Sequence, residues 1–257
     1  MSIQPMSPGP RKIVVLNPKG GSGKTTLATN LAAYYASRGH ATVLMDCDPQ
    51  GSSGRWLRNR SSELPAIHGV DACNTSMHTT RSWQLRTPPD TRYLIVDTSA
   101  AIPAQNLVEF TRGADSIVIP VGPSDTDIHA ATGFISNLLL VAKEDRREGR
   151  LSVVANRVRE GTVSYTRLMR FLQRLNIPVI AVLRDTQNYV HAAEEGMGIH
   201  EFKHYRVRKD IAQWTPMLRW LQSRIVTPLD EQAVIPPTQE RLHERLNPAP
   251  LTAVNTS

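Results

Sequence analysis

The sequence contains few cysteines, no long apolar run and no apolar segment near its start. Its two cysteines, Cys47 and Cys73, are too few for a disulfide framework, a four-cysteine zinc site or an iron–sulfur cluster held by one chain. No apolar stretch approaches the roughly 18–20 residues that a membrane-spanning helix requires. Residues 1–10 lack the apolar core of a signal peptide. These absences favour a soluble, cytoplasmic protein.

Acidic residues are fewer than basic ones. The chain has 23 Asp and Glu against 30 Lys and Arg, which gives a net charge of +7. Residues 227–257 contain four acids and two arginines, so the rest of the chain carries +9. This balance permits nucleic acid or an anionic membrane as a partner and does not choose between them. The 40% of hydrophobic residues is enough for a buried core, which excludes a wholly disordered chain.

Proline-rich segments delimit the part of the chain that has a regular hydrophobic pattern. Residues 1–10 contain three prolines and little that packs, so we expect a flexible leader there. Residues 11–226 form the candidate folded domain. Residues 227–257 contain five prolines and end in Asn, Thr and Ser, which predicts a mobile tail with one short helical candidate at 239–246.

Short apolar runs alternate with amphipathic stretches along the candidate domain. We expect strands at 12–17, 42–46, 93–97, 116–121, 151–156 and 179–182, and helices at 23–38, 104–112, 125–148, 163–175, 189–195 and 208–224. This alternation predicts an α/β fold, in which a doubly wound, mainly parallel sheet has helices on both faces. Residues 49–89 break the rhythm, and we expect only a short helix at 54–59 within an irregular excursion.

The strongest motif is an apolar strand that leads into a glycine-rich turn and then a helix, from Lys12 to Thr26. Glycines let backbone N–H groups turn toward phosphate oxygens, and the helix N-terminus adds a favourable dipole. Lys24 is expected to reach the β- and γ-phosphates, and the Thr25 hydroxyl to ligate Mg²⁺. The expected nucleotide-binding residues are Gly20, Gly21, Ser22, Gly23, Lys24, Thr25 and Thr26.

This loop departs from the common G-x-x-x-x-G-K-[ST] pattern, because Pro18 replaces the first glycine and a second lysine, Lys19, precedes the glycine pair. The segment Lys19 to Thr26 resembles the deviant Walker A motif of the ParA/MinD family of P-loop ATPases. In that family the extra lysine crosses a dimer interface to the partner's nucleotide. The resemblance therefore implies a homodimer that depends on ATP and Mg²⁺, with Lys19 and Lys24 as catalytic residues. The alternative for Lys19 is an ordinary solvated loop lysine.

The resemblance covers roughly residues 11–224, so it implies one ATPase domain over 11–226 and includes two acidic motifs. Asp46 and Asp48 lie in D-C-D-P-Q-G, which resembles the family's first switch. By that resemblance Asp46 supports the metal region and Asp48 positions or activates the attacking water. Asp97 ends a run that resembles a Walker B strand and is expected to bind Mg²⁺ with Thr25. The alternative is solvated acids at strand ends.

Two later segments resemble the family's surroundings of the base. Asn156 ends an expected strand where the family commonly reads the adenine edge, and the alternative is an asparagine that caps a turn. Arg184 and Asp185 are assigned by resemblance to the nucleotide or the dimer partner. After Asp97, the sequence Thr-Ser-Ala replaces the proline-containing pattern of many family members, so the second switch departs from that of the family.

Positive charge is concentrated after the expected ATP site. The segments 157–174 and 201–226 each carry a net +4. ParA-like proteins bind DNA without sequence preference through basic residues in their C-terminal half, and such binding weakens steeply with salt. The residues that the resemblance assigns to DNA are Arg167, Arg170, Arg174, Arg206, Arg208, Lys209 and Arg219. The alternative is an ordinary solvated face.

The resemblance implies a nucleoid-associated positioning ATPase. It would segregate a plasmid, a chromosome or a protein compartment such as a carboxysome, and a ParB-like or cargo-adaptor protein would stimulate its slow hydrolysis. A MinD-like membrane cycle is one alternative, but residues 240–246 have only two leucines and no basic excess, so a membrane partner is not expected. An ATP-dependent small-molecule synthase of the same fold is another, although no substrate domain or glutaminase segment is evident.

Overall fold

The computed structural model describes residues 9–73, 87–100, 102–142, 144 and 149–224. The chain divides into two units, Met1–Arg224 and Ile225–Ser257. The second unit, and with it the expected tail and the helical candidate at 239–246, lies outside the described residues. The expected leader also lies outside them, apart from its last two residues.

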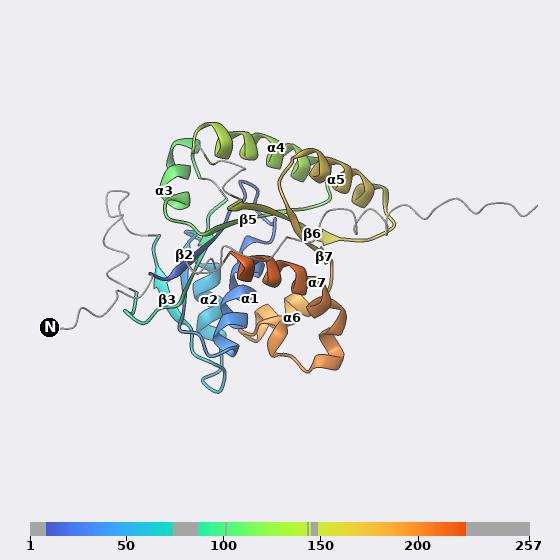
Figure 1. Ribbon diagram of the computed structural model, residues 1–257. Helices are drawn as coiled ribbons and strands as arrows, with labels where there is room; N and C mark the ends of the chain where they lie inside the picture. Colours follow the sequence, from blue (N-terminus) through green and yellow to red (C-terminus); the bar gives the residue numbers. More distant parts are fainter. Residues whose placement is uncertain (1–8, 74–86, 101, 143, 145–148, 225–257) are drawn as a thin grey trace, which may run out of the picture. The chain divides into compact units, whose positions relative to one another are not determined.

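Seven parallel strands form one sheet in the order β3-β2-β4-β1-β5-β6-β7 (Figure 1). Their bounds are β1 Arg11–Val15, β2 Thr42–Cys47, β3 His68–Asp71, β4 Tyr93–Thr98, β5 Ser116–Val121, β6 Leu151–Val158 and β7 Val179–Arg184. Most of these strand residues are buried, because helices cover both faces of the sheet. The predicted doubly wound α/β fold is confirmed.

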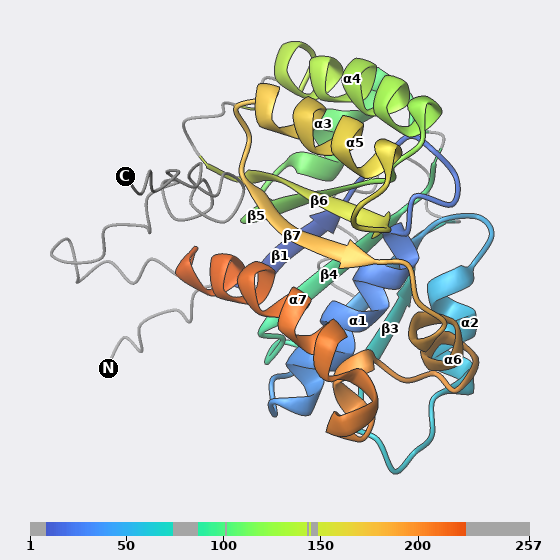
Figure 2. The same cartoon turned by 90° about the vertical axis from the view of Figure 1, so that its right-hand side faces the viewer.

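Successive residues of each strand point to opposite faces and so contribute to two separate cores. In β1, Ile13 and Val15 pack into one core, and Val14 packs into the other. The first core lies under α1 Lys24–Ser37, α2 Ser52–Asn59, α6 Asn188–Glu194 and α7 His204–Ser223. The second lies under α3 Leu107–Thr111, α4 Asp125–Leu140 and α5 Val163–Arg174, as Figures 1 and 2 show.

The structure corrects the expectation for residues 49–89. Besides the helix α2, this excursion contains the edge strand β3, which pairs in parallel with β2. The strand was not predicted because only Val70 of its four residues is buried, so it has no apolar run. Tertiary pairing with β2 therefore overrides a weak local pattern.

Several helix bounds also differ from those expected. The helix predicted at 125–148 ends at Leu140, shortly before six consecutive charged residues at 143–148 that offer no apolar side chain to pack on the second core; of these six only Glu144 is among the described residues. The helix predicted at 208–224 begins earlier, at His204, because Val207 is already buried against the first core. The segment predicted as a helix at 104–112 begins with the 3₁₀ turn Ala104–Asn106.

Candidate functional site

The strand register gathers the predicted acids at the carboxyl edge of the sheet. Asp46 of β2 pairs with Asp97 of β4, and Asp97 also pairs with Val15, the last residue of β1. The glycine-rich loop leaves β1 at this edge and leads into α1. In open parallel sheets this edge is where ligands bind, so the fold brings the loop and both acids to one place.

Two glycines of the loop adopt the left-handed backbone conformation that other residues rarely take. Gly21 has φ +73° and Gly23 has φ +95°. A Cβ on Gly23 would lie 2.1 Å from Nδ2 of Asn156, so a side chain there would displace Asn156. The first turn of α1 begins at the next residue, Lys24, with its free N–H groups at the loop. This backbone is suited to hold phosphate oxygens.

Lys24 lies folded over the loop. Its side chain is buried, and its Nζ donates a hydrogen bond of 3.1 Å to the carbonyl oxygen of Lys19. Burial lowers the pKa of Lys24, while the carboxylates of Asp97 and Asp48 act in the opposite direction. The site therefore holds a desolvated cation between the loop and the two acids, where an incoming phosphate would meet it.

Lys19, the second lysine of the motif, is held by the start of α4. Its Nζ forms an ion pair of 2.6 Å with Asp127 Oδ1 and a hydrogen bond of 2.8 Å to Thr126 Oγ1. Burial of Asp127 opposes its ionisation, but hydrogen bonds from Lys19 and Ser124 outweigh this effect and lower the pKa of Asp127. The Lys19 side chain is thus bound within its own protomer, and its contact with a partner's nucleotide stays a prediction.

Asp46 shapes the loop between β2 and α2. Its Oδ1 accepts a 3.0 Å hydrogen bond from the amide of Asp48, and its Oδ2 accepts one of 2.8 Å from the amide of Gly54. Asp48 lies half-buried on this loop and accepts a 3.0 Å hydrogen bond from the amide of Gln50. Asp46 therefore positions the segment that carries Asp48, and their predicted roles toward metal and water stay predictions.

Asp97 is fully buried between the loop and α2. Its Oδ2 accepts a hydrogen bond from Ser53, and the Thr25 hydroxyl lies near enough to lower the pKa of the carboxyl. Its Oδ1 has no partner within the part of the chain that the structure describes, and the same holds for the buried hydroxyl of Ser22. Burial raises the pKa of Asp97 to about 6, against the lowering effect of Ser53 and Thr25.

These oxygens form a donor set that fits Mg²⁺ and a triphosphate. A buried carboxylate oxygen without a partner is unfavourable unless a cation or donor joins it. Mg²⁺ prefers such hard oxygen ligands and commonly keeps only one or two from the protein, the rest coming from water and phosphate. Among the described residues no group of three or more His, Cys, Asp or Glu is arranged to hold a metal ion, so a cation here would need Thr25 and a bound phosphate as well.

Asn156 supports the phosphate loop. Its Nδ2 donates a 2.8 Å hydrogen bond to the carbonyl oxygen of Ser22, and its side chain is buried. The neighbouring Arg157, with φ +55°, donates to the carbonyl oxygen of Gly21 at 3.3 Å. The contact in the structure is therefore with the loop, and the predicted reading of adenine by Asn156 stays a prediction.

Arg184 and Asp185 are bound within the protomer. Arg184 Nε and NH2 donate to the two carboxylate oxygens of the buried Asp210, at 2.5 and 3.0 Å. Asp185 pairs with Arg159 at 3.1 Å. Arg184 therefore anchors β7 to α7, which sequence patterns alone did not reveal.

Three further groups at the site were missed by sequence reasoning. Asn17 donates to the carbonyl oxygen of Pro120 at 2.6 Å and accepts from the amide of Lys19 at 2.7 Å, so it fixes the start of the loop. Ser53 bonds Asp97, and Ser124 with Asp127 forms a capping box at the start of α4. Only the capping box leaves a local signal, because serine is followed three residues later by an acid.

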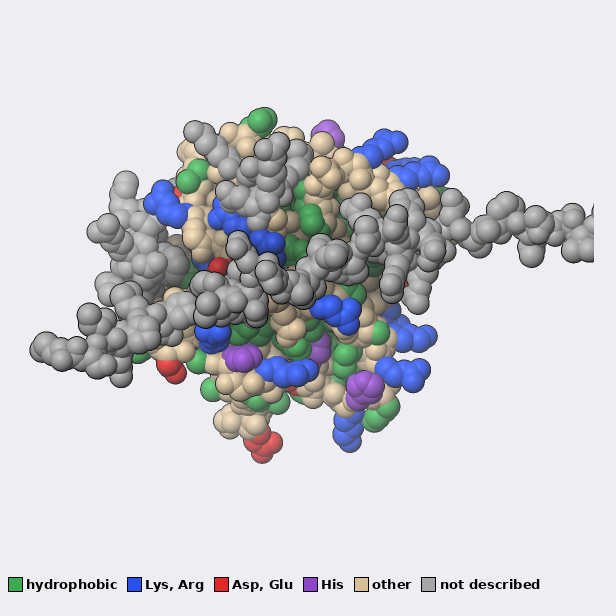
Figure 3. All heavy atoms as spheres, in the orientation of Figure 1, with side chains coloured by type: hydrophobic (Ala, Val, Ile, Leu, Met, Phe, Trp, Pro, Cys, Tyr) green, Lys and Arg blue, Asp and Glu red, His purple; other side chains and the backbone are tan. Residues whose placement is uncertain are grey.

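The predicted DNA-binding residues are all exposed, on two helices that flank the edge strand β7. Arg167, Arg170 and Arg174 lie on α5, and Arg206, Arg208, Lys209 and Arg219 lie on α7. Figure 2 shows the two helices on opposite faces of the sheet beside β7, and Figure 3 shows Lys and Arg side chains along this side. Two segments that are separate in sequence thus border one edge of the molecule.

Some of these basic side chains already have partners. Arg167 forms an ion pair with Asp125, and both side chains are largely exposed. Arg206 contacts His191 Nδ1 at 2.7 Å and lies over the ring of Phe202 at 4.9 Å. Because exposed ion pairs are weak, these partners do not prevent contact with a polyanion. Within the described ranges, none of the helices combines the length and the apolar character of a membrane span.

Comparison with known proteins agrees with this site. Residues 13–199 match the model of the CobQ/CobB/MinD/ParA nucleotide binding domain. The chain is 30% identical over 213 residues to the maintenance of carboxysome distribution protein A of Gloeobacter kilaueensis, which covers 82% of this chain and 93% of that protein.

Two solved structures share the fold at low identity. A chain of the Aquifex aeolicus MinC:MinD cell division protein complex has a TM-score of 0.65 and 18% identity, covering 86% of this chain and 98% of that chain. A variant of Cyanothece McdA in complex with ATP has a TM-score of 0.63 and 14% identity, covering 86% and 99%. The family match, which spans the loop, both acidic motifs and Asn156, shows that this chain belongs to the CobQ/CobB/MinD/ParA family of nucleotide-binding domains.

Proposed function

We propose that this protein is a ParA-type positioning ATPase, which binds ATP in a dimer, associates with nucleoid DNA and places a cellular cargo. The observation that carries the proposal is the pair of lysines on one phosphate loop, with Lys24 folded over the loop and Lys19 at its rim. A single loop lysine suffices to bind a nucleotide within one protomer. A second lysine on the same loop supports a role that involves a partner subunit.

The residues of the site suit slow ATP hydrolysis. Lys24 and the loop amides would bind the phosphates, and Thr25 with Asp97 would hold Mg²⁺. When bound, Mg²⁺ would neutralise phosphate charge at the reacting centre. Asp48 accepts from Gln50 on the loop that Asp46 holds, so its carboxylate is available to orient a water molecule.

Dimerisation would require Lys19 to exchange its partners. In this protomer Lys19 is bound by Asp127 and Thr126, and a triphosphate in a second protomer would offer it a stronger anion. ATP would then stabilise the dimer by mass action, because it binds the associated state better than the separate chains. This reasoning makes dimerisation dependent on ATP.

DNA binding would use the exposed basic residues of α5 and α7. Each protomer carries these two helices beside β7, so a dimer would present two copies of the surface. Neutralising several DNA phosphates gives an affinity that falls steeply as salt rises. No recognition-helix pattern accompanies these residues, which favours binding without sequence preference.

The cargo that we propose is a protein compartment of the carboxysome type, recruited through an adaptor protein that stimulates hydrolysis. The supporting observation is the long match to a carboxysome-distribution protein. The match to the chromosome-partitioning ATPase Soj of Thermus thermophilus has 51% identity but covers only 20% of either chain. The longer match favours a compartment over a plasmid or chromosome as cargo.

The proposal is tested by imaging the tagged protein in its native cell together with candidate cargoes. A nucleoid-bound gradient that follows one cargo is expected. An Asp48→Ala variant should keep ATP-dependent dimerisation and DNA binding but hydrolyse ATP more slowly, with a static nucleoid pattern. ATP-dependent binding to anionic liposomes without DNA binding would instead favour a membrane cycle, and hydrolysis that depends on a metabolite would favour a synthase.

A further inference from the structure

Helix α2 begins at the acids of the candidate ATP site. The amide of Gly54 donates to Asp46 Oδ2 at 2.8 Å, and the hydroxyl of Ser53 donates to Asp97. Both residues belong to the first turn of α2, and Ser53 is fully buried. The position of this turn therefore depends on the charge and hydrogen bonding of the two carboxylates.

The other end of α2 is joined to the segment 196–201 by a buried ion pair. Arg60, the residue after α2, donates from NH2 to Glu201 Oε1 at 2.5 Å and from NH1 to Oε2 at 2.9 Å. The two side chains are only 5% and 4% exposed. Arg60 NH1 also donates to the carbonyl oxygen of Gly196 at 3.0 Å. A bidentate pair in this setting fixes both distance and orientation.

Backbone packing strengthens the same junction. A Cβ on Gly196 would lie 2.5 Å from the backbone nitrogen of Arg60, so the two backbones are in close contact. Trp56 Nε1, on the buried side of α2, donates to the carbonyl oxygen of Met197 at 3.2 Å. Glu201 also accepts from the amide of Gly198 at 2.7 Å. Helix α2 and the segment 196–201 therefore form one connected unit.

This segment leads directly into the basic helix α7. The 3₁₀ turn Ile199–Glu201 ends three residues before α7 begins at His204. Arg206, Arg208 and Lys209 lie in the first two turns of α7 and are exposed. A displacement of Glu201 would consequently move the first two turns of α7, which carry most of its basic residues.

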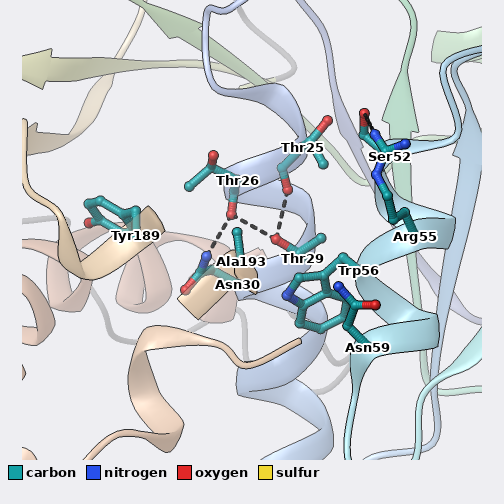
Figure 4. Close-up of a pocket in the computed structure, with 10 residues that line it drawn as sticks. All are labelled: Thr25, Thr26, Thr29, Asn30, Ser52, Arg55, Trp56, Asn59, Tyr189 and Ala193. Atoms are coloured by element: carbon teal, nitrogen blue, oxygen red, sulfur yellow. Dashed lines mark hydrogen bonds between the residues drawn. The ribbon is translucent and has the colours of Figure 1, made fainter. Parts of the chain in front are cut away.

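A pocket leaves space beside α2 on the side of α1. It has a volume of about 230 Å³ and lies between α1, α2 and α6 (Figure 4). Four of its lining residues, Ser52, Arg55, Trp56 and Asn59, belong to α2. Trp56 packs into the first core, whereas the pocket leaves space along this side of α2 from Ser52 to Asn59. A short helix in this arrangement moves as a rigid body more readily than a fully packed one.

We propose that α2, together with Arg60, acts as a strut that transmits the state of the ATP site to the start of α7, with Arg60 and Glu201 as its positioning residues. The inference rests on the proposed function, because it takes Asp46 and Asp97 as the acids that meet Mg²⁺ and phosphate. When Mg²⁺ and phosphate bind near these two carboxylates, the hydrogen bonds that Ser53 and Gly54 donate to them are lost or changed. The first turn of α2 then shifts, and the ion pair carries the shift to Glu201.

The test compares the wild-type protein with the double variant Arg60→Met, Glu201→Met, which removes both buried charges and leaves neither unpaired. Arg58→Met, an exposed arginine of the same helix, is the matched control. Hydrogen exchange of residues 196–209 is measured with and without ATP and Mg²⁺, alongside ATP affinity, dimerisation and affinity for a random-sequence DNA duplex. Glu201→Gln, which keeps the side-chain shape, serves as a second variant if the double variant is too unstable.

In the wild type and in Arg58→Met, ATP should change exchange at 196–209 and raise DNA affinity about tenfold. In the double variant the exchange response should vanish and the ATP effect on DNA affinity should fall to about twofold, with ATP affinity and dimerisation retained. Glu201→Gln should lose part of both responses. The strut would be overturned if either the double variant or Glu201→Gln kept the full ATP effect on exchange and on DNA affinity. It would also be overturned if those effects fell only in proportion to weaker dimerisation.

The two proposals fail in different ways. An exchange response in the wild type without any DNA binding would refute nucleoid association and leave the strut standing. ATP-dependent DNA binding with no exchange response at 196–209 would refute the strut and leave the proposed function standing.

Discussion

The phosphate loop and the basic side of the molecule use positive charge in contrasting ways. At the loop, Lys24 is 6% exposed and Asp97 is fully buried, so each charge is desolvated and each contact is strong. On α5 and α7 the arginines are exposed to solvent, where water and salt screen them. A single substitution at the loop should therefore have a large effect on ATP binding. A single substitution on α5 or α7 should have a small effect on DNA binding, and several together should add up.

The largest effect is expected from Lys24→Ala. The variant loses the buried cation that we propose to meet the phosphates, so ATP affinity should fall about 100-fold or more. Titration with a fluorescent ATP analogue measures this loss. Lys209→Ala, which removes a charge from the exposed surface of α7, should retain the wild-type affinity. Equal losses in the two variants would contradict the contrast between the regions.

The next largest effect is expected from Asp97→Asn, which should stabilise the folded protein. The raised pKa of Asp97, about 6, means that the folded protein binds a proton more readily than the unfolded chain. Between about pH 4 and 6 stability therefore falls as pH rises, and above this range the ionised carboxylate costs roughly 3 kcal/mol. Asp97→Asn should thus raise the melting temperature at pH 7.5 without nucleotide, while Mg²⁺-dependent hydrolysis is lost.

The pH dependence of this gain is its control. At about pH 4.5 the wild-type carboxyl is largely protonated in the folded state, so the difference in melting temperature should shrink toward zero. A stabilisation that is equal at both pH values would mean that burial of the Asp97 charge is not its cause.

A smaller effect is expected from Asp127→Asn, at the border between the two regions. The Lys19–Asp127 pair is partly exposed, at 35% and 15%, so its loss should free Lys19 at a cost of about 1 kcal/mol. ATP-dependent dimerisation should then become about fivefold tighter, which analytical ultracentrifugation measures. Asp125→Asn, on the same turn of α4 but paired with Arg167, should leave dimerisation unchanged. A weaker dimer in Asp127→Asn would show that Asp127 assists Lys19 instead of retaining it.

The smallest effects per residue are expected on the basic helices. Arg170→Ala should lower DNA affinity about threefold at low salt and reduce the slope of affinity against salt by about 1. The double variant Arg170→Ala, Arg174→Ala should roughly double the loss in the logarithm of DNA affinity and the loss of salt slope, because the two sites act independently. Arg58→Ala, an exposed arginine of α2, is the control. Unchanged salt slopes would identify the α5 surface as an ordinary solvated face.

Local sequence patterns predicted most of the fold and the core of the site. Apolar β-branched runs predicted six of the seven strands, because strands covered on both faces need apolar residues throughout. The strand β3 was not predicted, because its pairing with β2 and not its own composition makes it a strand. The loop from Lys19 to Thr26 was predictable because its glycines, lysine and threonine are contiguous and its backbone geometry is local.

The contacts that adjust the site were not predictable, because they depend on which strands are neighbours. Lys19 meets Asp127 because β1 and β5 are adjacent in the sheet, so the loop after β1 lies beside the start of α4. Asn156 reaches Gly23 from β6, one strand further. Side chains that are far apart in sequence meet only after the strand order is fixed.

The sequence alone therefore determined the chemistry: a phosphate loop with two lysines, acids at strand ends and a basic C-terminal half. The tertiary structure decided the connections, including the retention of Lys19 by Asp127 and the buried Arg60–Glu201 pair between α2 and the segment before α7. The physical reason is the range of each interaction. Backbone conformation and hydrophobic pattern act over a few residues, whereas ion pairs and buried hydrogen bonds join whatever the folded sheet brings together.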